Sequence, residues 1–85
     1  MAVDYAAICS PSRVEHICTA RFIYCYMMHK FCGLSSTRIG RLINRDHASV
    51  LHAEKRVKQW LDDPRIYPPG AHYANRIEER INYYL

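Results

Sequence analysis

The sequence predicts an all-α fold, a helix-turn-helix bundle of about five helices. Residues 14 to 31 contain no glycine or proline and repeat apolar side chains at helical spacing, which is typical of a central core helix. A shorter helical segment closes at Ile39-Gly40, and a strongly helical run begins a few residues later. Two helices joined by so tight a turn have the spacing of a helix-turn-helix.

A first short helix is expected over residues 3–9, which are apolar and rich in alanine. Tyr5, Ile8 and Cys9 are expected to lie on one side of it. Pro11 disfavours helical backbone angles at Ser10, so residues 10–13 are predicted to form an exposed loop. That loop carries Arg13 just ahead of the main helix.

The central helix is predicted from Val14 or Glu15 to Phe31. Its core stripe follows spacings of three and four residues: Ile17, Ala20, Tyr24, Met27 and Phe31. Tyrosines, methionines and cysteines on its other sides indicate packing on more than one face. Three outward residues, whose long stems can reach solvent or phosphate, are expected on the remaining surface: Arg21, His29 and Lys30.

Gly33 ends the central helix, and Ser35 or Ser36 is a suitable N-cap for a short helix over residues 37–42. Ile39 and Leu42 are expected to point inward from that helix. Asp46 is predicted to cap the next helix, which should run to Trp60 or Leu61. Its buried stripe is expected to be Val50, Ala53, Val57, Trp60 and Leu61.

Residues 62–85 form a separate segment of the predicted domain, after a helix-turn-helix region over residues 1–61. Residues 67–70 read as a stiff turn, and a last helix is expected from about Ala71 to Tyr84. Its apolar stripe consists of Tyr73, Ile77, Ile81, Tyr84 and Leu85. This stripe either covers the domain's own core or serves as a surface for a homodimer or a protein partner.

Charge is unevenly distributed along the chain. The formal net charge is +4, with +5 on residues 1–61 and −1 on residues 62–85. The region of the predicted helix-turn-helix is therefore the basic one, as expected for a phosphate-binding face.

Cysteine usage and hydropathy narrow the class of protein. Cys18, Cys25 and Cys32 recur every seven residues without a CxxC pair, so we expect free thiols in a reducing cytoplasm. Cys25 and His29 supply only two nearby metal ligands, too few for a structural zinc site, and no metal or other cofactor is predicted. The start has no signal peptide, and no apolar run is long enough to span a bilayer.

The front of the helix that begins near Asp46 has side chains suited to base edges in a major groove. Asp46 can accept from a cytosine amino group, His47 can donate to guanine or thymine, and Ala48 can touch a thymine methyl group. Ser49 or His52 can hold phosphate. The alternative is that Asp46 serves only as a cap and His47 is only solvated.

Residues 45–53, RDHASVLHA, closely resemble the signature GRDHTTVLHA of the C-terminal domain of the bacterial replication initiator DnaA. Three further segments resemble the same domain in the same order. Residues 33–40 are similar to its GLSLPEIG segment, Ala20-Arg21 to its ARQ segment, and residues 8–13 lie where it has LLSKKR. The resemblance covers about residues 5 to 61.

This resemblance implies a Trp-repressor-like domain that reads the major groove of duplex DNA and reaches into the minor groove from a basic loop. By position, Arg13 is then the minor-groove arginine, and Asp46, His47 and Ala48 face bases. The resemblance also places Thr37 and Leu51 near thymine methyl groups, and Arg21, Ser49 and His52 on phosphates. Arg45, within the signature, is assigned to the interface as well, and Lys55 is added because of its own chemistry.

The sequence also departs from the family pattern. Ala48 replaces a residue that usually bears a hydroxyl, and Asn44 alone stands where the family has two glycines, so the target sequence and the tilt of the recognition helix are expected to differ. Glu15 places a negative charge next to the basic loop, and Ser36-Thr37 replaces Leu-Pro. A chain that begins at Met1 leaves no room for an ATPase module, which implies a stand-alone domain.

Two functions follow from these features. The first is sequence-specific binding of double-stranded DNA in replication or transcription control. The alternative is a protein-interaction module that binds or antagonises a replication initiator without specific DNA binding. No enzyme and no nucleotide site are predicted, because the sequence has no glycine-rich phosphate loop and no paired acid and base at a known spacing.

Overall fold

The computed structural model describes residues 4–84, and all regular structure in that range is helical. The helices are α1 (Tyr5–Cys9), α2 (Glu15–Cys32), α3 (Ser36–Ile43), α4 (His47–Asp62) and α5 (Pro68–Tyr84). The predicted all-α helix-turn-helix bundle of five helices is confirmed.

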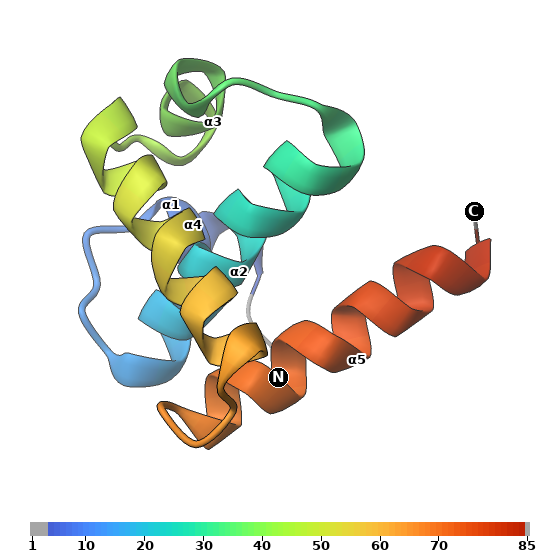
Figure 1. The fold of residues 1–85 in the computed structure, drawn as a ribbon. Coiled ribbons are helices and arrows are strands. Elements are labelled where there is room, and N and C mark those ends of the chain that lie inside the picture. The colour runs from blue at the N-terminus through green and yellow to red at the C-terminus, as the bar shows by residue number, and fades with distance from the viewer. Residues whose placement is uncertain (1–3, 85) are drawn as a thin grey trace.

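Helix α2 lies at the centre of the bundle, and α4 crosses it (Figure 1). Two groups of buried side chains hold the helices together. One joins α1, α2, α3 and α4 through Ile8, Ala20, Cys25, Ile39, Ile43, Val50 and Ala53. The other joins α2, α4 and α5 through Ile23, Met27, Val57, Trp60, Ala71 and Ala74. Because α4 contributes to both, its orientation is fixed along most of its length.

Helix α3 differs from the prediction on one side chain. Ile39 is buried as expected, but Leu42 is 39% exposed and Ile43 is 1% exposed. Ile43 lies four residues after Ile39 on the same face and takes the place in the core beside it. The prediction that Leu42 points inward is wrong because Ile43 fills that place; the helix ends at Ile43, one residue later than expected.

Helix α5 begins three residues earlier than predicted. Pro68, Pro69 and Gly70 form its first turn instead of a separate connection. Proline is tolerated there because the first amide groups of a helix have no acceptor within the helix. Of the predicted stripe, three residues pack on the core, Tyr84 is 75% exposed, and Leu85 lies outside the described residues. The packed residues are Tyr73, Ile77 and Ile81.

The N-terminal helix is short and capped. Asp4 accepts a hydrogen bond from the Ala7 amide at 2.9 Å, and Ile8 is the buried residue of α1. Tyr5 is 50% exposed, and its hydroxyl donates to the Leu42 carbonyl and ties α1 to α3. Val3, with which the predicted helix began, lies outside the described residues.

The four cysteines are free thiols, as predicted, in three different environments. Cys25 is buried, Cys9 and Cys18 are half-buried, and Cys32 is exposed. Burial raises the pKa of the Cys25 thiol to about 12, so this group stays protonated and behaves as an apolar core residue.

Gly70 offers a direct test of how α5 packs. A Cβ atom at this position would lie 2.5 Å from Cε3 of Trp60 and 2.6 Å from Cδ2 of Tyr67. Gly70→Ala should therefore push α5 away from α4, lower the free energy of unfolding by about 1–3 kcal/mol, and change the fluorescence of Trp60, the single tryptophan. Thermal melts and emission spectra measure both effects.

Asn75→Ala is the matched control, since Asn75 is exposed on the same helix. It should leave the emission of Trp60 unchanged. If Gly70→Ala had the melting temperature of the parent, α5 would not pack against Trp60 as closely as described.

Candidate nucleic-acid interface

Asp46 is the N-cap residue of α4 and stabilises the first turn of this helix. Asp46 has extended backbone angles, φ −78° and ψ 166°, and its carboxylate accepts a hydrogen bond from the Ser49 amide at 2.7 Å. That bond lowers the pKa of the Asp46 carboxyl, since it favours the charged form. The predicted capping role of Asp46 is confirmed, and the helix presents its positive end next to this residue.

The turn between α3 and α4 depends on a close approach of two backbone segments. The Arg45 amide donates to the Gly40 carbonyl at 2.8 Å, and a Cβ atom on Gly40 would lie 2.4 Å from the Arg45 carbonyl oxygen. Asn44 ends α3 in the left-handed conformation, with φ 60°. Asparagine tolerates this conformation better than most residues with a side chain, so one residue is enough to reverse the chain here.

Most residues predicted to contact DNA are accessible. Nine of the eleven have exposed side chains: Arg13, Thr37, Asp46, His47, Ala48, Ser49, Leu51, His52 and Lys55. Arg45 is half-buried and Arg21 is buried. Leu51, 52% exposed, is the one large apolar side chain that α4 leaves open at its front.

Arg21 lies elsewhere than predicted. It is 7% exposed, and its guanidinium donates to the carbonyls of Ile8, Ser10 and Ser12 at 2.9, 2.8 and 3.0 Å. The prediction that Arg21 lies on an outer face, available to phosphate, is wrong in this structure. A buried guanidinium is tolerated only when its donors are satisfied, and here the end of α1 and the following loop satisfy them.

A basic hollow lies on one side of α4. It is lined by side chains of the 10–13 loop, of α2, of the turn between α3 and α4, and of α4, among them Arg13, Arg45 and His52. The His52 ring meets the half-buried Phe22 ring edge-on, with the ring centroids 5.9 Å apart. Within the described chain, residues 4–84, the Arg13 guanidinium makes no hydrogen bond or ion pair. The hollow therefore offers the Arg13 guanidinium to an anionic partner.

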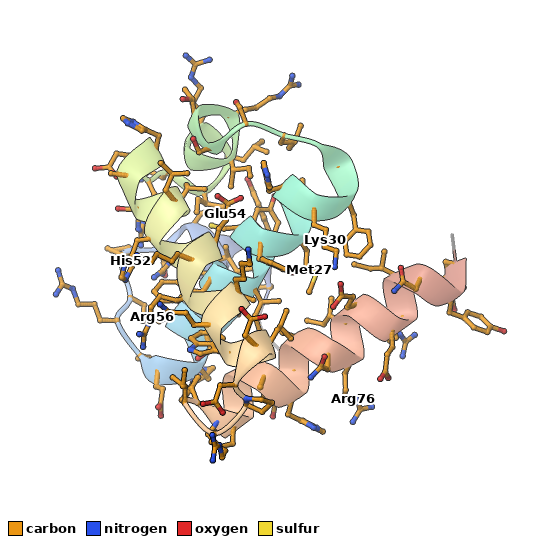
Figure 2. All side chains as sticks on the ribbon, in the orientation of Figure 1. Met27, Lys30, His52, Glu54, Arg56 and Arg76 are labelled. Atoms are coloured by element: carbon orange, nitrogen blue, oxygen red, sulfur yellow. The ribbon has the colours of Figure 1, made fainter. Side chains whose placement is uncertain are left out.

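A second concavity, the lysine groove, lies on the opposite side of α4. It is lined by Tyr26, His29, Lys30, Leu51, Glu54, Lys55 and Lys58. Figure 2 shows Glu54 on the side of α4 that faces α2, with His52 and Arg56 directed to the other side. Lys30 is paired with Glu78 of α5, whereas Lys55 and Lys58 are exposed. Helix α4 thus has cationic side chains on both flanks.

Glu54 is an unusual neighbour for these lysines. Its Oε1 atom is buried without a hydrogen-bond partner among the described residues, and Nδ1 of His29 lies 3.6 Å away. Burial raises the pKa of the Glu54 carboxyl, and His29 opposes that shift.

Sequence reasoning missed Phe22, Glu54 and Lys58 as parts of this surface. The spacing of Leu51, Lys55 and Lys58 at four and three residues is a helical signal that would have found the lysine. Glu54 fits the same face, three residues after Leu51 and four before Lys58, whereas no comparable signal existed for Phe22, whose position depends on how α2 and α4 cross.

Among the described residues, 4–84, no group of three or more His, Cys, Asp or Glu side chains is arranged to hold a metal ion. In the same range, no helix is long and apolar enough to cross a membrane.

The fold and this surface define a helix-turn-helix protein. The sequence model of the family described as "Bacterial dnaA protein helix-turn-helix" matches residues 1–57. The chain belongs to this family. The match ends within α4 and leaves all of α5 outside.

Similar curated proteins support the same family assignment. The chain is 34% identical over 74 residues to the chromosomal replication initiator protein DnaA of Clavibacter sepedonicus, covering 85% of this chain and 16% of that protein. It is 39% identical over 61 residues to the protein of the same name from Bacteroides thetaiotaomicron, covering 71% of this chain and 13% of that protein. The chain thus spans about a seventh of the length of these relatives.

Glu54 gives the site a predicted pH dependence. Because its pKa is raised in the folded chain, the folded state holds this proton more tightly than the unfolded state does. Stability is therefore lost as the pH rises from the unfolded pKa, about 4.3, through the folded value. Glu54→Gln removes the charge and should raise the melting temperature at pH 7, with the gain disappearing near pH 3.

Glu79→Gln, at an exposed position of α5, is the matched control and should give no pH-dependent gain. Melting curves across this pH range measure both variants. An equal difference between Glu54→Gln and the parent at every pH would contradict the assignment of a buried, costly carboxylate.

Proposed function

We propose that this chain binds double-stranded DNA sequence-specifically, with the first turns of α4 in the major groove and Arg13 in the adjoining minor groove. One observation carries the proposal: the exposed front of α4 is flanked by the basic hollow on one side and the lysine groove on the other. A major groove is about 12 Å wide and its walls are phosphates, so a helix that enters it meets phosphate on both flanks.

The exposed residues divide by chemistry into base readers and phosphate binders. Asp46 and His47 reach base edges, and Ala48 and Leu51 contact thymine methyl groups. Thr37, at the start of α3, adds a further methyl contact. Ser49, His52 and Lys55 bind phosphates, and Lys58 extends the same row along α4.

Family membership supports DNA binding, and the relatives' printed names support a place in replication control. We extend the proposal to transcription control because the same interface serves both. The preferred duplex should differ from that of proteins with a hydroxyl-bearing residue at position 48, because Ala48 makes no hydrogen bond with its side chain.

Arg13→Ala and His47→Ala test the two halves of this interface. Each should weaken binding to a duplex selected from a random library by about tenfold or more, while the melting temperature stays that of the parent because both side chains are exposed. The parent's affinity should also fall with salt, by about 0.9 decade per decade of salt for each phosphate neutralised. Fluorescence anisotropy of a labelled duplex measures these affinities.

Arg76→Ala and His72→Ala are the matched controls on α5, where Arg76 points away from the bundle (Figure 2). They should bind as the parent does. Parent-like affinity of both Arg13→Ala and His47→Ala for the selected duplex would overturn the proposal.

Asp46 allows capping and base reading to be separated. Serine caps helices about as well as aspartate does, so Asp46→Ser should melt near the parent while changing the base that is preferred at one position. Asp46→Ala should lower stability as well. Repeating the library selection with Asp46→Ser measures the change, and recovery of the parent's duplex would show that Asp46 serves only as a cap.

A second candidate, a protein-interaction module, is favoured by an apolar hollow on the α1, α2 and α5 side of the bundle. Its lining residues are Ile8, Ala20, Ile23, Tyr24, Met27, Met28 and Ile77. Selection in which no duplex is enriched, by a protein that melts cooperatively, would favour this candidate over DNA binding.

A further inference from the structure

Two arginines, one in α2 and one in the turn between α3 and α4, converge on one backbone carbonyl. Nη2 of Arg45 donates to the Ser10 oxygen at 2.6 Å, and Nη2 of Arg21 donates to the same atom at 2.8 Å. Ser10 ends α1 and begins the loop that carries Arg13. A carbonyl has two lone pairs, so both bonds can form at once.

Arg21 fixes this loop on the body of the protein. Its Nε bonds the Ile8 carbonyl, and Nη2 bonds the Ser10 and Ser12 carbonyls. The remaining contact is a longer one, from Nη1 to the Cys18 sulfur at 3.6 Å. Four of the five guanidinium N–H groups are thereby used, and the fifth belongs to a side chain that is 93% buried.

Arg45 adds a different link, because it belongs to the turn between α3 and α4. Its amide is bonded to Gly40, and Nη1 donates to the Asn44 carbonyl at 3.0 Å. The side chain then spans from the residue before Asp46 to a loop 35 positions earlier in the sequence. The first turn of α4 and the loop at Ser10 are joined by this one guanidinium.

The loop is also held by hydrogen bonds within it, on both sides of Arg13. The Ser12 amide donates to the Ser10 hydroxyl at 3.3 Å, and the Val14 amide donates to the Ser12 hydroxyl at 3.2 Å. Ser10 in turn donates from its hydroxyl to the Ala7 carbonyl at 2.6 Å. The backbone on both sides of Arg13 is held, and its side chain is the exposed part.

We infer that Arg45 is a positioning residue: through the Ser10 carbonyl it sets the place of Arg13 relative to the first turn of α4, and it does not itself neutralise a phosphate. This inference rests on the proposed function. Binding that spans a major and a minor groove requires two contacts at a fixed separation, and a loop that is already ordered does not lose its freedom on binding. Each loop residue that must be ordered on binding weakens affinity by about tenfold.

A double-mutant cycle separates positioning from direct contact. The parent, Arg13→Ala, Arg45→Ala and the double variant are titrated with one labelled duplex, selected by the parent from a random library. If Arg45 acts through Arg13, Arg45→Ala alone weakens binding by about tenfold, and the double variant binds no more weakly than Arg13→Ala. Single effects that multiply in the double variant would overturn the inference.

The salt dependence of duplex binding distinguishes a phosphate contact by Arg45 from a positioning role. In the Arg13→Ala background, loss of Arg45 should leave the slope of log affinity against log salt unchanged. A decrease of about 0.9 in that slope would show that Arg45 neutralises a phosphate. If Arg13→Ala alone binds like the parent, the minor-groove contact of the proposed function fails, and the inference fails with it.

Two variants guard against loss of fold and against a general charge effect. Arg45→Lys keeps a cationic donor for the Ser10 carbonyl and should recover part of the lost affinity, with a melting temperature near the parent's. Arg41→Ala, an exposed arginine on α3, removes the same charge without a contact to the loop among the described residues. Arg41→Ala should change the affinity for the duplex by the same factor in the parent and in the Arg13→Ala background. If its effect also vanished in the Arg13→Ala background, a specific link between Arg45 and Arg13 would lose its support.

Discussion

The burial of one side of α4 against α2 and its neighbours is the constraint on which the rest of the structure depends. Val50, Ala53 and Val57 are each no more than 2% exposed, which leaves α4 no freedom to rotate about its axis. With about 3.6 residues per turn, the side chains opposite this stripe must then face outward, and among them are Ala48 and Lys55. The core residues of α4 therefore decide which side chains are available for recognition, although none of them touches a partner.

A second constraint, the geometry of the turn between α3 and α4, sets where α4 starts. Gly40 lets the backbone of Arg45 approach α3 more closely than any residue with a Cβ atom would allow. The left-handed Asn44 reverses the chain within one residue, and Asp46 caps the new helix at once. Arg45 lies between these two and reaches the 10–13 loop, so the geometry of the turn is passed on to a segment far away in sequence.

Much of this fold could be predicted from the spacing of apolar residues. The helices are long enough to show the helical period clearly, and their capping residues indicate the same boundaries. The end of α2 at Gly33 and the Asp46 cap were predicted correctly, and these depend on local chemistry. Arg21 and Leu42 were predicted wrongly for a common reason: a helical period tells which residues share a face, but not what a second element brings to that face. The carbonyl oxygens that bury Arg21 come from α1 and its loop, up to 13 positions away. The start of α5 was predicted late because prolines that break a helix interior are accepted in a first turn.

The two acidic residues nearest the proposed interface have different physical reasons to be there. Glu15 lies in the first turn of α2, where the helix dipole favours a negative charge. Glu54 has no such compensation, since its buried oxygen lacks a hydrogen-bond partner among the described residues. In the proposed binding mode a carboxylate beneath Lys55 and Lys58 weakens the attraction for phosphate, which is the part of DNA affinity that does not depend on sequence. Base contacts by His47 and Asp46 then account for a larger share of the total affinity, whereas the ratio of affinities between two sites, which depends on the base contacts, stays the same.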